Sequence, residues 1–580
     1  MPRLTPVQTS FTAGEISPRL QARFDLDAYY TGAAKLVNFV CLPHGPIIKR
    51  QGTTFIAEAG SKDPRLIPFK FSVTQSMVLE FGEHYIRFYF KGGQLTNPDG
   101  TPYQITSPYS EAQAKEIDFA QSGDTIFIVH PRIAPQKLVR YGNTNWTITP
   151  ETFVAQPENW TDNNWPSHIV FHEQRLYYAN TPSRPQTIWA TRIGLFNDFT
   201  MKSDSDDVLD DHAIEYTISS DEVNGIQWMK AVNTLACGTS GAEYSIHANY
   251  RTDSITPKNI RVSRQTSYGS LPVRVQQIGS GLAFVQRGGT RVRIFEYGYV
   301  EDQYTSVDVT MMSEHILSSG VKEMDLQTVQ DPYIWCVLND GSLVGLSYEK
   351  SQKVQAWHRH IFPNGRASSI CIIPGDVSDE VWLVMKRTIN GVEKTYIESF
   401  LDAFSEISRP QDGYFMDSHL YYEGDLAIDQ IGGLDHLEGQ EVVVLVDGWV
   451  HPKRTVIRGS ITLQTFGNKI VVGIPFEAQF ESCQIQSSDS VIMGYRKRVY
   501  SAKISMLQSL GMKVGVKGYP EQEVFMGPTK VMNKAQDLYT GTISVKVPAS
   551  SEDDTQVYVH HDMPLPCEVR AIKYDIEVNQ

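Results

Sequence analysis

A unit of three or four short predicted strands recurs through the middle of the chain, and this repetition limits the fold more than any other feature. A hairpin at residues 76–90 comes first, and the later copies occupy residues 117–146, 166–190, 224–246, 275–295, 334–358 and 368–398. A spacing of about 40–60 residues is the size of one propeller blade, and a single blade cannot bury both faces of its sheet. We therefore predict a mainly β fold, with a propeller-like ring of short-stranded sheets over residues 60–405.

The ring is predicted from this rhythm alone, because no WD or Kelch signature repeats in the sequence. Two ordinary β-sandwiches are the alternative. In the second strand of the hairpin, Tyr85, Arg87 and Tyr89 alternate with Ile86, Phe88 and Phe90. This period of two predicts that one face of the strand is buried. Large aromatic side chains fill the space between sheets, so we expect five tryptophans at blade interfaces: Trp189, Trp228, Trp335, Trp357 and Trp382.

The segments on either side of the ring have a different character. Prolines and glycines are spread through residues 1–59, which favours an extended arm with at most one short helix around residues 25–37. Residues 406–580 predict a C-terminal β-barrel or sandwich domain, in which Asp447-Gly448 marks a tight hairpin.

The charge of the chain bears on its partners. The formal net charge is −14, which argues against a protein that grips nucleic acid through phosphate contacts. It is compatible with an acidic channel wall to which nucleic acid does not adhere. Six scattered cysteines without a CxxC pair indicate free thiols in a reducing compartment. No apolar run approaches the roughly 18–20 residues of a membrane helix, and the N-terminus does not read as an export signal.

Several residue groups resemble chemical sites, but the sequence assigns no catalytic, cofactor-binding or metal-binding residue. His358 and His360 share one face of a strand and form half of a zinc site, although a solvated strand end is the simpler interpretation. His560 and His561 are adjacent, so they point to opposite faces.

The acidic run at residues 204–211 matches a calcium-binding loop only in part. Counted from Asp204, Glu215 takes the twelfth place of an EF-hand loop, but Leu209 occupies the sixth, where glycine is required. A solvated loop is therefore the expectation. Gly279-Ser-Gly281 and Arg287-Gly-Gly-Thr lie between strands and are not nucleotide fingerprints. A glycan-cleaving site with a pair of carboxylates is an alternative that the sequence leaves open, since the two residues of such a site come together only in the folded structure.

The beginning of the chain reads Ser10-Phe-Thr-Ala-Gly-Glu15-Ile-Ser-Pro-Arg19-Leu, and Lys49-Arg-Gln-Gly52-Thr-Thr-Phe55 follows later. This wording resembles the start of the tail nozzle proteins (tail tubular protein B-like, or DNA-stabilisation proteins) of short-tailed bacteriophages. Ala13 stands where that pattern has glycine, and Lys49-Arg50-Gln51 replaces Arg-Arg-Pro. Stretches such as Gly433-Leu-Asp-His-Leu-Glu-Gly439 and Met563-Pro-Leu-Pro566 extend the resemblance over nearly the whole chain.

The resemblance implies a structural virion protein and not an enzyme, with no cofactor. Copies of the chain would form a hexamer at the distal end of the phage tail, made in the host cytoplasm. This hexameric channel would dock on the head–tail adaptor ring, carry tail fibres or spikes, retain the packaged DNA and conduct the double-stranded DNA non-specifically at ejection. A receptor-binding or polysaccharide-cleaving tail protein is the alternative.

Two expectations follow for the assembly. We expect the arm to make inter-subunit or adaptor contacts through Phe11, Ile16, Leu20, Phe39 and Phe55, so that deleting residues 1–35 spares the fold. Six copies of a chain with charge −14 carry −84 in total, so the lumen should be lined by net negative charge.

Overall fold

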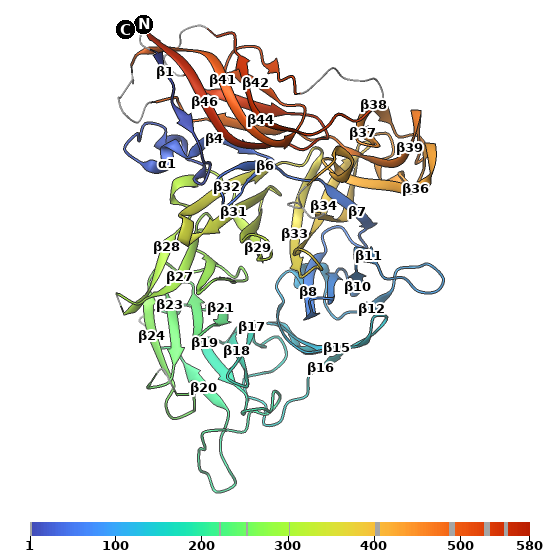
Figure 1. The fold of residues 1–580 in the computed structure, drawn as a ribbon. Coiled ribbons are helices and arrows are strands. Elements are labelled where there is room, and N and C mark those ends of the chain that lie inside the picture. The colour runs from blue at the N-terminus through green and yellow to red at the C-terminus, as the bar shows by residue number, and fades with distance from the viewer. Residues whose placement is uncertain are drawn as a thin grey trace.

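The computed structural model describes the chain at residues 3–219, 222–250, 253–300, 302–400, 407–486, 494–526, 534–549 and 555–579. Within these residues, seven antiparallel sheets surround a common centre (Figure 1). They coincide with the hairpin and the six repeated units of the sequence. The prediction of a mainly β, propeller-like ring is confirmed, and the chain does not form two sandwiches here.

The first four blades follow one another along the chain. Blade one contains β8 (Arg65–Ser72), β9 (Gln75–Phe81), β10 (Tyr85–Phe90), β11 (Gly93–Gln94) and β12 (Gln104–Thr106), and the short helix α2 (Glu111–Ala114) leads to the next blade. Blade two contains β13 (Asp118–Ser122), β14 (Thr125–His130), β15 (Ile133–Gly142) and β16 (Asn145–Pro150). Blade three contains β17 (His168–His172), β18 (Arg175–Thr181), β19 (Arg184–Ala190) and β20 (Ile214–Thr217). Blade four contains β21 (Ile226–Ala231), β22 (Leu235–Thr239), β23 (Glu243–His247) and β24 (Arg261–Thr266).

The last three blades complete the circle. Blade five contains β25 (Gln276–Ile278), β26 (Gly281–Val285), β27 (Val292–Gly298) and β28 (Gln303–Asp308). Blade six contains β29 (Val321–Gln327), β30 (Tyr333–Leu338), β31 (Leu343–Glu349) and β32 (Val354–His360). Blade seven contains β33 (Gly365–Ile373), β34 (Glu380–Ile389), β35 (Val392–Phe400) and, from the N-terminal segment, β7 (Thr53–Glu58).

The ring is closed by this exchange between distant parts of the sequence. β7 pairs antiparallel with β35 and immediately precedes blade one along the chain. Near the centre, the Leu66 N–H of blade one donates to Ser369 Oγ of blade seven at 3.1 Å. The first strands of neighbouring blades lie side by side. β17 lies between β13 and β21, β29 lies between β25 and β33, and β33 also lies beside β8. The first strands therefore line the centre of the ring.

Adjacent blades pack face to face, which decides the burial of each strand. All five tryptophans named above are buried in clusters shared by two neighbouring blades, so that expectation is confirmed. The expectation of one buried face for residues 85–90 is wrong. Ile86 and Phe88 are buried, but so are Tyr85 and Tyr89 on the other face, because each blade is covered on both sides by neighbours.

The N-terminal segment joins the ring to the C-terminal sheets. Blade six continues through β3 (Gly14–Glu15) and β4 (Gly32–Val37) into β40 (Ala478–Ser482), β45 (Val557–His561), β42 (Lys513–Val516) and β43 (Gln522–Glu523). Blade seven continues beyond β7 into β36 (Asp417–Ile431), β39 (Ile461–Ile474), β37 (Glu441–Val446) and β38 (Trp449–Thr455). The short helix expected near residues 25–37 is α1 (Asp27–Tyr30), and residues 32–37 form a strand instead of extending it.

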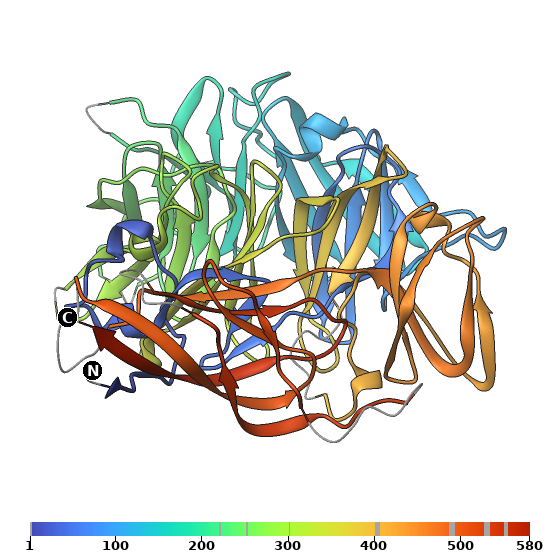
Figure 2. The same cartoon turned by 90° about the horizontal axis from the view of Figure 1, so that it is seen from above.

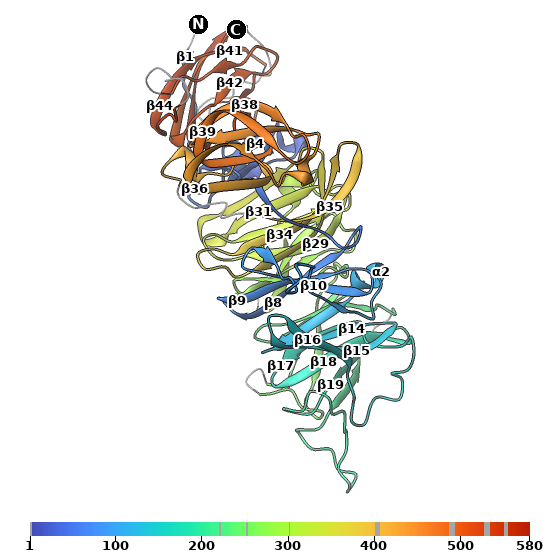
Figure 3. The same cartoon turned by 90° about the vertical axis from the view of Figure 1, so that its right-hand side faces the viewer.

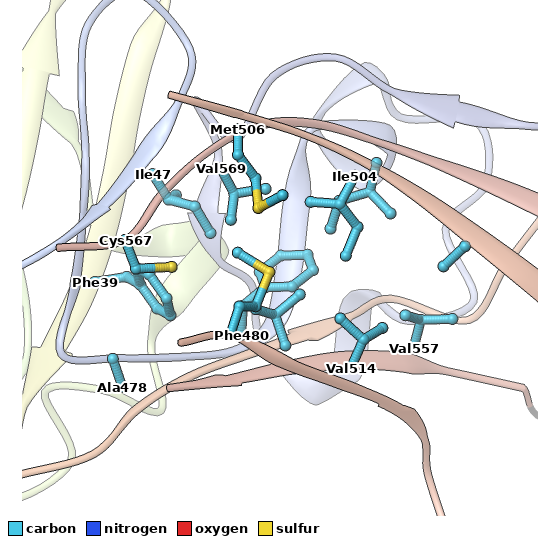
Figure 4. Close-up of a cluster of buried hydrophobic side chains, with 14 of the residues drawn as sticks. Phe39, Ile47, Ala478, Phe480, Ile504, Met506, Val514, Val557, Cys567 and Val569 are labelled. Atoms are coloured by element: carbon cyan, nitrogen blue, oxygen red, sulfur yellow. The ribbon is translucent and has the colours of Figure 1, made fainter. Parts of the chain in front are cut away.

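A third C-terminal sheet packs against the extension of blade six. It contains β44 (Tyr539–Lys546), β41 (Arg496–Ser509), β46 (Glu568–Asn579), β6 (Ile47–Lys49) and β5 (Phe39–Cys41), with β1 (Arg3–Leu4) and β2 (Val7–Gln8) on β46. Figure 4 shows side chains of both sheets, among them Ile504 and Val569 of one and Phe480 and Val557 of the other, meeting in one buried cluster. Among the described strands these sheets are open, so this part is a sandwich and not a closed barrel.

The C-terminal sheets lie to one side of the ring, as the view from above shows (Figure 2). In the side view, both termini lie with them at one end of the molecule, and the strands of blade three lie toward the other end (Figure 3). The predicted hairpin at Asp447-Gly448 joins β37 to β38, with φ of 46° and 83° at its two central residues. None of the described helices is long and apolar enough to cross a membrane.

Candidate functional site

The residues that carry the N-terminal motif lie where the ring meets the C-terminal sheets. Gly14 has a φ of +62°, and a Cβ atom there would lie 2.5 Å from the backbone nitrogen of Trp357 in blade six. Only glycine fits this approach. The next residue, Glu15, is buried and accepts hydrogen bonds from Arg359 Nε at 3.0 Å and from the Leu36 N–H at 2.7 Å. Its carboxylate also lies 2.8 Å from His315 Nε2.

The second motif, Lys49-Arg50-Gln51, is buried in the same junction. The Arg50 guanidinium donates to both oxygens of Asp417, at 2.7 and 2.8 Å, and stacks over Phe476 at 3.8 Å from the ring centroid. Lys49 Nζ donates to the Met563 carbonyl at 2.7 Å and lies 3.1 Å from His561 Nδ1. Burial lowers the pKa of Lys49 to about 7. The first motif therefore holds the arm against blade six, and the second joins the arm to the C-terminal sheets.

The five apolar anchors of the arm, Leu20 included, pack against residues of the same chain, so they are not the free contacts for other subunits that the sequence predicted. Phe11, Ile16 and Phe39 are buried. Phe11 makes an edge contact with Phe480 of β40, with ring centroids 5.1 Å apart. Phe55 stacks on His436 and is also packed inside. The arm has no core of its own, as its composition indicated, and its apolar side chains pack against other parts of the same chain.

His358 and His360 do share one face of β32, as predicted, but they are not at a solvated strand end. Both are buried, and His358 Nδ1 lies 2.7 Å from His360 Nε2. Burial lowers the pKa of His358 to about 3, which keeps the ring neutral. The pair forms part of the packing around Trp335. Among the described residues, no group of three or more His, Cys, Asp or Glu side chains could hold a metal ion.

The remaining sequence candidates are also accounted for by local structure. His560 and His561 point to opposite sides of β45, the first toward Glu521 at 3.1 Å and the second into the core. The run that begins at Asp204 is an exposed loop, and Glu215 is engaged by Arg184 and by Trp189 Nε1. The two glycine-containing segments at 279–281 and 287–290 are turns between strands of blade five.

All six cysteines are free and buried. Burial raises the pKa of Cys237, Cys483 and Cys567 to about 12, so these thiols stay protonated.

No sequence pattern pointed to the centre of the ring, where the structure gathers charged side chains from separate blades. Two adjoining cavities lie there, with volumes of about 540 and 160 Å³. Both are lined by Arg65, Lys115 and Arg274. These residues stand at or just before the first strands of blades one, two and five, so only the closed ring brings them together.

Three carboxylates at the centre fasten one blade to the next. Each lies on a first strand and accepts a backbone N–H from the first strand of the following blade. The hydrogen bonds join Asp118 to Ile169 at 3.3 Å, Glu323 to Ile370 at 2.9 Å and Asp325 to Ile372 at 2.7 Å. A buried carboxylate is stable only when such donors replace water, so these acids are structural clasps.

Two arginines reach across the centre. Arg274, just before blade five, stacks on Phe119 of blade two at 3.6 Å from the ring centroid and lies 3.8 Å from Asp118. Arg65 of blade one lies 3.4 Å from Glu323 of blade six. Cavities of this size accommodate small molecules and are far too small for a DNA duplex. The centre of one chain is thus a charged pocket.

No protein-family model matches the chain, and no curated protein sequence is detectably similar to it. Among solved structures, the WD40 repeats of RRP9 share 9% identity at a TM-score of 0.39, covering 61% of this chain and 99% of that one. The Pan2 WD40 domain of Neurospora crassa shares 8% identity at a TM-score of 0.34, covering 61% and 90%. U3-55K shares 7% identity at 0.37, covering 60% and 98%. The propeller itself is established by the seven sheets and their connections.

Proposed function

We propose that this chain is a structural protein of a short-tailed phage tail, where copies of it form the nozzle ring. The observation that carries the proposal is the place of the two N-terminal motifs. The residues that resemble the nozzle proteins hold the arm in place: Gly14 and Glu15 contact blade six, and Arg50 pairs with Asp417 at the start of the C-terminal sheets. Similarity at residues that make such contacts supports a shared architecture more strongly than similarity of overall composition would.

The filled centre of the propeller bears on how such a ring would conduct DNA. Since Arg274 and Arg65 cross the centre of a single chain, a duplex would have to pass between copies, through a lumen that the ring encloses. The net charge of −14 per chain suits a wall that does not hold phosphates. Docking on a head–tail adaptor and carriage of fibres or spikes belong to the same proposal.

Electron microscopy of the purified full-length protein tests the proposal directly. We expect six-fold rings with a lumen, formed by the protein alone or after addition of the adaptor ring. A particle that stays monomeric under both conditions would contradict it. Incubation with host surface glycan separates the alternative, since release of shortened glycan would identify a polysaccharide-cleaving tail protein.

A further inference from the structure

The larger of the two cavities at the centre of the propeller is lined by more cations than carboxylates. Its lining includes four cations (Arg65, Lys115, Lys230 and Arg274) and two carboxylates (Glu116 and Asp118), and carboxylates outside the lining pair with two of the cations, Arg65 and Lys115. A volume of about 540 Å³ lies within the range of pockets that hold small ligands.

The two carboxylates are already engaged. Asp118 accepts backbone hydrogen bonds from Phe119 at 2.8 Å and Ile169 at 3.3 Å, and lies 3.4 Å from His168 Nδ1. Glu116 is largely exposed and lies 3.3 Å from His130 Nε2. Neither acid is therefore available to neutralise the whole cationic wall.

The four cations differ in how far they are satisfied. Arg65 Nη1 donates to three backbone carbonyls, those of Ala114, Lys115 and Ile117, and its Nε lies 3.4 Å from Glu323. Lys115 pairs with Asp63 outside the cavity. Arg274 stacks on Phe119, but among the described residues its charge meets a carboxylate only at 3.8 Å, in Asp118, and its Nη1 is buried with no hydrogen-bond partner there. Lys230 has neither a hydrogen bond nor an ion pair from its ammonium group within the described part of the chain.

We propose that Lys230 and Arg274 form a binding site for a small oxyanion of the phosphate class in the centre of the propeller. A phosphate oxygen accepts strong charge-assisted hydrogen bonds from both a guanidinium and an ammonium group, and the two are left with donors to spare. Burial and the neighbouring Arg274 lower the pKa of Lys230 to about 8, a cost that a bound anion would relieve. This assignment does not depend on a place in a phage tail.

The test uses the full chain and inorganic phosphate at constant ionic strength near pH 7. Lysine labelling with an amine-reactive reagent, mapped by mass spectrometry, should show several-fold protection of Lys230 by phosphate, while the exposed Lys258 is labelled equally with and without it. Calorimetric titration should show phosphate affinity reduced about tenfold or more in Lys230→Met and left unchanged in Lys258→Met.

Arg274→Lys keeps a cation at the centre and serves as a second variant that disturbs the ring less than removal of the charge. It should weaken phosphate binding, because a lysine cannot offer the planar pair of donors. A phosphomonoester such as glycerol 2-phosphate is titrated in parallel. Tighter binding of the ester identifies an organic phosphate as the ligand, and equal or weaker binding identifies the free ion. Unprotected Lys230 in the wild-type chain, or unchanged affinity in Lys230→Met, would overturn the proposal.

Discussion

Lys49 shows how strongly a single residue depends on its surroundings in this molecule. It has no exposed surface, and its ammonium group is held by the Met563 carbonyl beside His561. Burial lowers its pKa from 10.5 to about 7, with Arg50 adding to the effect and Cys567, Asp562 and Asp417 opposing it. The sequence identified Lys49 only as part of the Lys49-Arg50-Gln51 motif and gave no sign of its burial.

A pH series on Lys49→Met tests this assignment. Between pH 7 and 10.5 the unfolded chain binds a proton at this lysine that the folded chain has lost, so Lys49 makes stability rise with pH in that window. The difference in unfolding free energy between wild type and variant should therefore change by roughly 4–5 kcal/mol across it. Denaturant titrations at several pH values measure this, and Lys258→Met is the exposed control. A constant difference would contradict the assignment.

Trp382 tests the blade interfaces at the same scale. It has no exposed surface, its ring centroid lies 5.7 Å from that of Tyr89 in blade one, and it packs in a cluster shared by blades one and seven. Trp382→Ala should lower the free energy of unfolding by about 3–5 kcal/mol because the cavity cannot close. Tyr299→Ala, at a side chain that is 90% exposed, should change it by less than about 0.5 kcal/mol. Equal effects of the two changes in thermal unfolding would rule out this packing.

At the scale of elements, the N-terminal segment decides whether the parts of the chain hold together. β7 completes blade seven, and β4 pairs with both β32 of the ring and β40 of the C-terminal sheets. These strands are too short to form a sheet of their own, so their stability comes from the elements they join. The segment is therefore a seam within one chain.

Deleting residues 1–35 should now be expected to loosen the fold, contrary to the expectation from sequence. The deletion removes Phe11 and Ile16 from the core and the Glu15 carboxylate from Arg359. We expect a clearly lower melting temperature and faster proteolysis of the C-terminal sheets. Removal of residues 1–5 alone, which among the described residues takes away the two-residue strand β1, should leave both nearly unchanged. A truncated chain as stable as the full one would show that the seam is dispensable.

At the scale of the whole molecule, charge is the property that the proposed ring would use. A chain with net charge −14 should not retain duplex DNA at physiological ionic strength, since binding through phosphates requires clustered cations on the surface. Mobility-shift assays with a random duplex should show no complex at micromolar protein concentrations. Tight binding would contradict passage of DNA through a ring of these chains, and the cations gathered inside the propeller offer no surface for it.

The sequence determined the features that depend on local order. Short strands bounded by turn residues recur at the spacing of a blade, and the Asp447-Gly448 turn and the interface tryptophans follow from composition and periodicity. It also placed His358 and His360 on one face of a strand, because that geometry needs nothing beyond a period of two.

Only the tertiary structure decided what those elements surround. Closure of the ring joins residues that are far apart in the chain. It accounts for the burial of His358, for the place of β7 in blade seven and for the contact between Arg274 and Asp118. The side chains of the central pocket come one or two at a time from separate blades, so no window of sequence contains them together. Closure of the ring removes their water and gathers their charges, and the chemistry of the centre arises from that step.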